Sequence, residues 1–141
     1  MADYLHVLQH AAVGATCSLE RCDSDWLFSF EDRLTLNVVC PWRIVTNSGI
    51  AVTDEDHIPL IGLKREGGAT VATNALLSGK RLVAFSAEIR TADLRLIFEE
   101  DVQLQVTNNS SLHDCWRASF RYGEQSLTAI GTGGGDVDFR E

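Results

Sequence analysis

The sequence is short of several features that define large classes of proteins. It has 12 basic residues against 20 acidic ones, which gives a formal net charge of −8. Nucleic acids and anionic membranes are bound through a basic face, so this charge argues against both as partners. No apolar run approaches the roughly 18 residues of a membrane-spanning helix, and the first residues lack the basic start and apolar core of a signal peptide. We therefore expect a cytoplasmic protein that binds neither nucleic acid nor membrane.

The residue spacings of common cofactor and metal sites are also missing. The glycine run 131–135 leads into Asp136 and strand-like sequence, where a dinucleotide fingerprint needs another glycine and a helix, and it lacks the Lys and Ser or Thr of a phosphate loop. The acidic run 54–57 lacks the regular ligand spacing and the glycine of a calcium loop. His6 and His10 share a helix face, but no general-base Glu accompanies them, which indicates surface histidines. We expect no cofactor and no metal, and a flexible or bulged turn at the glycines.

Cysteine is scarce, with four residues at positions 17, 22, 40 and 115. In a cytoplasmic protein we expect these side chains to be reduced and mostly buried. A zinc site built from Cys17, Cys22, His113 and Cys115 is the alternative, but the spacing is looser than the tight pairs that structural zinc favours. No local signature supports a catalytic cysteine.

The clearest positive signal is residues 93–106, where two alternating runs flank three consecutive acids. One side of the predicted hairpin would carry Leu94, Leu96, Phe98, Val102, Leu104 and Val106. Side chains alternate between the two faces of a strand, so this pattern predicts a β-hairpin with one buried face. Ile97 on the opposite face indicates that this outer face is partly covered.

The same pattern occurs at residues 25–38, which match position for position at an offset of 68. The match resumes at an offset of 74, where Trp42-Arg43 corresponds to Trp116-Arg117. These correspondences indicate an internal duplication, with pseudo-repeats at 3–53 and 69–139 joined by a linker at 54–68.

The predicted fold is a single domain over residues 1–141 of the α+β class, mostly antiparallel β. We expect about eight strands in a duplicated meander, packed as a sandwich or closed as a barrel, with short helices at 3–13 and 69–77. Asp3 would cap the first helix, and Gly14 and Gly79 would end the two helices. An exposed strand edge would offer a surface for a homodimer.

The segment Cys40-Pro41-Trp42-Arg43-Ile44, the repeated hairpin and the C-terminal Gly-Gly resemble a family of small bacterial proteins that is catalogued as a domain of unknown function. The resemblance covers most of residues 14–139. It implies a repeated apolar hairpin and a short strand after the glycines, and it implies no catalytic residue. Acids stand here where the hairpin turns of that family have glycine.

The Trp-Arg pairs are the most unusual repeated feature. We interpret Trp42 and Trp116 as core anchors and their arginine neighbours as partners of nearby acids. The alternative is a cationic patch of Arg43, Arg117 and Arg121 that binds carboxylates or phosphates, because arginine binds both in a bidentate manner.

The favoured function is a non-enzymatic binding or interaction domain, whose partner is a second copy of the chain or a basic protein. One sharper alternative is an immunity-type inhibitor that masks a basic toxin with Glu99, Glu100 and Asp101. The other alternative is a small-ligand binder or enzyme with a pocket between the two repeats. The candidate lining of that pocket is Arg43, His57, His113 and Arg117.

Overall fold

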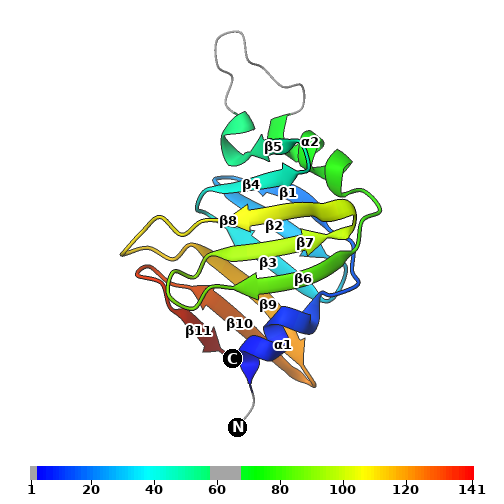
Figure 1. The fold of residues 1–141 in the computed structure, drawn as a ribbon. Helices are drawn as coiled ribbons and strands as arrows, with labels where there is room; N and C mark the ends of the chain where they lie inside the picture. The colour runs from blue at the N-terminus through cyan, green and yellow to red at the C-terminus, as the bar shows by residue number, and fades with distance from the viewer. Residues whose placement is uncertain (1–2, 58–67) are drawn as a thin grey trace.

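The computed structural model describes residues 3–57 and 68–141, and it consists of two antiparallel sheets and two α-helices (Figure 1). The six-stranded sheet has, in spatial order, β1 (Ser18–Cys22), β2 (Asp25–Phe30), β3 (Leu34–Val38), β9 (Trp116–Tyr122), β10 (Gln125–Gly131) and β11 (Val137–Arg140). The five-stranded sheet has β5 (Gly49–Thr53), β4 (Trp42–Thr46), β8 (Val102–Val106), β7 (Leu94–Phe98) and β6 (Leu82–Ala87). The helices are α1 (Tyr4–Ala11) and α2 (Gly68–Leu77), with short 3-10 turns η1 (Asp54–His57) and η2 (Glu99–Asp101).

The α+β class with mostly antiparallel sheets is confirmed. The two sheets are open and lie face to face, so the fold is a sandwich and not a closed barrel (Figure 1). The described residues form eleven strands rather than about eight, because short edge segments such as β5 and β11 also pair with their neighbours.

Each sheet takes strands from both halves of the chain. Strands β1 to β3 of the N-terminal half continue into β9 and β10, while β6 to β8 of the C-terminal half continue into β4 and β5. The two junctions match in register, since Val38 pairs with Trp116 and Val106 pairs with Trp42. A pseudo-two-fold arrangement of equivalent halves accounts for this match, although the duplication itself stays a hypothesis from the sequence.

The core lies between the sheets and follows from the alternation of each strand. The Phe30 and Phe98 rings stack with centroids 6.2 Å apart, one from each sheet. Trp42 of β4 packs edge-on against Trp26 at 5.1 Å and against Phe28 at 5.3 Å. Burial of each such side chain stabilises the fold by roughly 2 kcal/mol, so these rings help to hold the two sheets together.

The helices close the ends of the sandwich, and each packs against the first strand of the other half. Helix α1 contacts β6 and α2 contacts β1. Asp3 caps α1 by accepting a hydrogen bond from the His6 amide at 3.1 Å, as predicted. On α2, the Asn74 side chain hydrogen-bonds the Leu19 amide at 2.7 Å and the Leu19 carbonyl at 2.9 Å. Asn74 thereby occupies backbone groups on an edge strand that would otherwise be free to pair with another chain.

Within residues 3–57 and 68–141 the chain crosses between the sheets twice, and a disulfide joins these crossovers. Pro41 lies in the first crossover, between β3 and β4, and Thr107 begins the second, between β8 and β9. Cys40 and Cys115 are bonded, with Cα atoms 5.1 Å apart. The expectation that all four cysteines are reduced thiols is therefore wrong for this pair, because the fold brings together two crossovers that are distant in sequence. Cys17 and Cys22 are free, the first buried and the second exposed.

The glycine-rich tail is a close-packed turn between β10 and β11, in which the Thr132 amide donates to the Asp136 carbonyl at 2.8 Å. A side chain at Gly131 would collide with the Trp116 indole, and one at Gly135 with the Arg90 carbonyl. Close approach by the rest of the protein therefore explains these glycines. Within the described residues, no helix has the length and apolarity needed to cross a membrane.

Candidate functional site

The candidate site is the outer face of the six-stranded sheet at the seam between the two halves of the chain. Alternation along β3 directs Leu34, Leu36 and Val38 into the core and leaves Thr35 and Asn37 facing outward. Strand β9 turns Arg117, Ser119 and Arg121 outward in the same way. Antiparallel pairing of β3 with β9 then sets these two outward rows side by side.

A continuous row of hydroxyl side chains crosses this face. The register of four adjacent strand pairs brings into one row Ser18, Ser29, Thr35, Ser119 and Thr128. Neighbouring strands lie about 4.8 Å apart, so five strands place hydroxyls along roughly 19 Å. Among residues 3–57 and 68–141, the last four of these hydroxyls make no hydrogen bond to another protein group. They are therefore available to a ligand.

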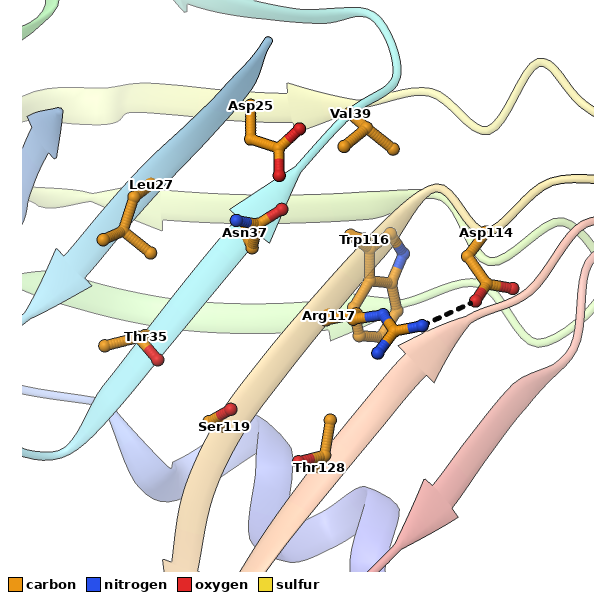
Figure 2. Close-up of a pocket in the computed structure, with 10 residues that line it drawn as sticks. All are labelled: Asp25, Leu27, Thr35, Asn37, Val39, Asp114, Trp116, Arg117, Ser119 and Thr128. Atoms are coloured by element: carbon orange, nitrogen blue, oxygen red, sulfur yellow. Dashed lines mark hydrogen bonds and ion pairs between the residues drawn. The ribbon is translucent and has the colours of Figure 1, made fainter. Parts of the chain in front are cut away.

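A hollow of about 570 Å³ lies over the last three hydroxyls of this row (Figure 2). Figure 2 shows Thr35, Ser119 and Thr128 on three adjacent strands along its floor, with Asn37 beside them. A second hollow of about 390 Å³ shares the same three hydroxyl residues and continues past Arg121. The two hollows together make a shallow groove along the β3–β9 seam.

The rim of the larger hollow carries charges of both signs and two apolar side chains. The Arg117 guanidinium lies 3.3 Å from the Asp114 carboxylate, and these side chains are 58% and 43% exposed. Asp25 adds a second carboxylate, while Leu27 and the half-exposed Val39 add apolar surface (Figure 2). The arginine already has a counter-ion, so the rim as a whole does not attract anions.

The matching face of the five-stranded sheet is built differently. There the Arg43 guanidinium donates to the Gln105 amide oxygen at 2.8 Å, and the Arg95 guanidinium donates to Gln103 at 3.0 Å. The row that corresponds to the hydroxyls contains Ala84, Ile97, Gln103, Val45 and Ile50. The same scaffold positions thus accept long or aliphatic side chains, so the fold itself does not require hydroxyls on the six-stranded sheet.

The structure brings only some of the predicted site residues together. Arg117 and Arg121 share one face, and the Arg121 guanidinium donates to the Glu124 carbonyl at 3.2 Å. Arg43 lies on the outer face of the other sheet, above a separate hollow of about 380 Å³. The three arginines therefore do not form one cationic patch.

Each of the three acids of η2 has an interaction partner within the protein. The Glu99 carboxylate accepts a hydrogen bond from the Arg81 amide at 2.8 Å, and Glu100 lies 3.4 Å from the Lys80 ammonium. Asp101 accepts a hydrogen bond from the Gln103 side chain at 3.4 Å. These carboxylates therefore have a structural role within the protein, whether or not they also contact a partner.

The two histidines named from the sequence lie away from the groove floor. His113 is exposed in the loop before β9, with its amide donating to the Ser110 hydroxyl at 2.9 Å. His57 ends η1, and its side chain lies outside the described part of the structure, as do residues 58–67 of the predicted linker. Of the residues expected to line a pocket between the repeats, Arg117 is the one that lines the larger hollow.

The chemistry of the groove is that of hydrogen bonding. In the part of the chain that the structure describes, no hydroxyl of the groove floor bonds a carboxylate or imidazole, which is the arrangement that activates a serine or threonine nucleophile. The described residues likewise contain no group of three or more His, Cys, Asp or Glu side chains placed to hold a metal ion.

Most of the groove was not identifiable from the sequence. Alternation places Thr35, Asn37 and Ser119 on outer faces, yet serine and threonine are ordinary there. What makes them a site is the pairing of β3 with β9, which joins segments far apart in the chain. Arg117 was found because its Trp-Arg motif is repeated.

Comparison with protein-family models, curated proteins and solved structures gave no match to this chain. The resemblance to a bacterial family of unknown function accordingly stays a prediction from the sequence, and the site is interpreted from its own geometry.

Proposed function

We propose that the chain is a non-enzymatic binding domain that takes its ligand in the groove on the outer face of the six-stranded sheet. The supporting observation is the contrast between the two sheets. On one outer face Gln103 and Gln105 are bonded to arginine side chains, whereas Thr35 and Asn37 hold the equivalent positions on the other, beneath a hollow of about 570 Å³. Binding sites are concave and present a few well-placed polar groups, and this face meets both conditions.

The immunity-type alternative receives less support from the described residues. Glu99 and the corresponding Glu31 are used as backbone acceptors at the two hairpin turns, which leaves fewer acids for a basic partner. The net charge of −8 remains its main support.

The binding face can be tested by blocking it with the side chains of the other sheet. We would titrate the ¹⁵N-labelled protein with a library of small polar fragments and map the amide shifts. Shifts should cluster at Thr35, Asn37 and Ser119. They should vanish in Thr35→Gln/Asn37→Gln, which copies the five-stranded sheet onto this face.

The matched control is Gln103→Thr/Gln105→Asn, which changes the other sheet and should leave the shifts in place. Shifts that gather over the Arg43 hollow, or that persist in the blocked variant, would refute the proposed face.

The cytoplasmic location is also a proposal, and the Cys40–Cys115 disulfide is the observation that counts against it and gives it a direct test. Cytoplasmic thiols are kept reduced, so rapid alkylation of freshly lysed cells should trap both as free thiols if the location is right. A disulfide recovered in the same experiment would place the protein in an oxidising compartment.

A further inference from the structure

We infer that the ligand of the groove is a neutral, linear glycan that lies across the strands of the six-stranded sheet. This inference rests on the proposed function and specifies its ligand class. Three properties of the groove support it: the hydrogen-bonding character of its floor, the balance of charge on its rim, and the direction of the hydroxyl row.

The floor is suited to a ligand that is rich in hydroxyl groups. A serine or threonine hydroxyl both donates and accepts hydrogen bonds, and the Asn37 amide also does both. Sugar hydroxyls have the same dual character, so Thr35, Asn37 and Ser119 can pair with them in either direction (Figure 2). An anion only accepts hydrogen bonds and a cation only donates them, so either would use half of the hydrogen-bonding capacity of the floor.

The rim argues against an anionic ligand. Arg117 is the only cation that lines the larger hollow in the described structure, and Asp114 lies 3.3 Å from it. Asp25 makes the formal charge of the rim −1, on a chain whose net charge is −8. Carboxylate and guanidinium groups each present paired hydrogen-bonding atoms, which suit adjacent hydroxyls on one sugar ring. Leu27 and Val39 provide apolar surface for the C–H groups of that ring.

The hydroxyl row gives the ligand its direction and length. It runs across the strands for roughly 19 Å, from Thr128 through the larger hollow and beyond it toward Ser29 and Ser18. A ligand with hydroxyls at regular intervals could use several members of the row, whereas a single sugar would reach only the part inside the hollow. The aliphatic residues in the matching row of the other sheet show that these hydroxyls are not needed for folding.

The experiment measures binding of the full chain to four neutral hexasaccharides, maltohexaose, cellohexaose, xylohexaose and chitohexaose, by calorimetry and saturation-transfer NMR. Hexagalacturonate serves as the anionic comparison. We expect at least one neutral glycan to bind, and to bind at least tenfold more tightly than hexagalacturonate. The variant Thr35→Val/Ser119→Ala removes two hydroxyls without enlarging either side chain, and should weaken binding about tenfold, the loss expected for two hydrogen bonds.

Val45→Thr is the matched control, because Val45 occupies the position on β4 that corresponds to Ser119. It should leave glycan binding unchanged. The inference is wrong if none of the neutral glycans binds at millimolar concentration, if hexagalacturonate binds best, or if the Thr35→Val/Ser119→Ala variant binds as well as the parent. If small fragments shift the groove amides but no glycan binds, the choice of a glycan as ligand is wrong while the binding face stands. If neither the fragments nor the glycans bind there, the proposed binding face is wrong as well.

Discussion

At the scale of single residues, Cys17 and Cys22 show how the fold decides the chemistry of a side chain. They lie five positions apart, yet one is buried and the other exposed. Burial raises the pKa of the Cys17 thiol far above its ordinary value of 9.0, because the thiolate would lose its hydration. The neutral thiol is therefore the form that the native state accepts.

This burial predicts a stability loss at alkaline pH. The folded pKa is raised, so the contribution of Cys17 is complete below pH 9 and declines as the thiol ionises in the unfolded chain. We expect the free energy of unfolding to fall by about 1 kcal/mol between pH 9 and pH 10 from this group. Urea titrations across this range should show a smaller decline in Cys17→Ala, and equal declines in the two proteins would contradict the prediction.

Thiol labelling gives a second residue-scale prediction. At pH 8, iodoacetamide should modify the native, unreduced protein once, at the exposed Cys22, because the buried Cys17 presents neither access nor thiolate. Unfolding should add Cys17, and reduction should add Cys40 and Cys115, for four modifications by mass spectrometry. Rapid modification of Cys17 in the native state would show that the first strand opens easily.

At the scale of elements, the two hairpin turns are anchored by equivalent carboxylates. Glu31 accepts a hydrogen bond from the Thr16 amide and Glu99 accepts one from the Arg81 amide, both at 2.8 Å. Thr16 and Arg81 form a bridge between the segments that enter β1 and β6. Each turn therefore holds the place where the two halves of the chain meet.

We expect Glu31→Ala and Glu99→Ala to lower the free energy of unfolding by similar amounts, about 1 kcal/mol each. The glutamine variants keep an acceptor and should lose less. Glu124→Ala is the control for the loss of negative charge, since the Glu124 carboxylate has no protein partner among the described residues. Unequal losses at the two turns, measured by urea unfolding, would show that they are not equivalent.

The disulfide is an element-scale feature because it fastens one crossover to the other. Its two cysteines are 75 positions apart, so the bond restricts a long loop of the unfolded chain. We expect Cys40→Ser/Cys115→Ser to be less stable than the parent by about 2–4 kcal/mol. Reducing agent should destabilise the parent by a similar amount and leave the double variant unchanged. If the unfolding midpoint of the parent does not change when reductant is added, this predicted stabilisation by the disulfide is wrong.

Local elements were predictable from the sequence, and long-range pairing was not. The β2–β3 and β7–β8 hairpins follow from alternation over neighbouring residues, and Pro41 marks the end of a ladder because proline cannot donate a backbone bond. The pairing of β3 with β9 has no such local signal. The disulfide, the groove and the separation of Arg43 from Arg117 all depend on that pairing, so they became visible only with the structure.

At the scale of the whole molecule, neither half of the chain forms a separate sheet among the residues that the structure describes. Each sheet joins strands from both halves, and the core rings of Phe30 and Phe98 come one from each. The stable folding unit is therefore the two halves of the chain together.

Cleavage between the halves tests this directly. A protease site inserted within residues 58–67 should yield two fragments that migrate together on a non-reducing gel, held by Cys40 and Cys115, and separate after reduction. In native buffer the cleaved protein should keep the circular dichroism of the intact chain even when reduced, because strand pairing and the shared core still join the fragments. Either fragment folding by itself after separation would contradict this description.

The contact between the first helix and the last strand has a consequence for chain order. The Tyr4 ring lies 5.8 Å from Phe139 and 6.1 Å from Tyr122, so the two ends of the described structure meet (Figure 1). A circular permutant that joins these ends through a short linker and opens at 58–67 would present the halves in reverse order. Every strand would still find its neighbour. The fold therefore does not depend on which half of the chain is synthesised first.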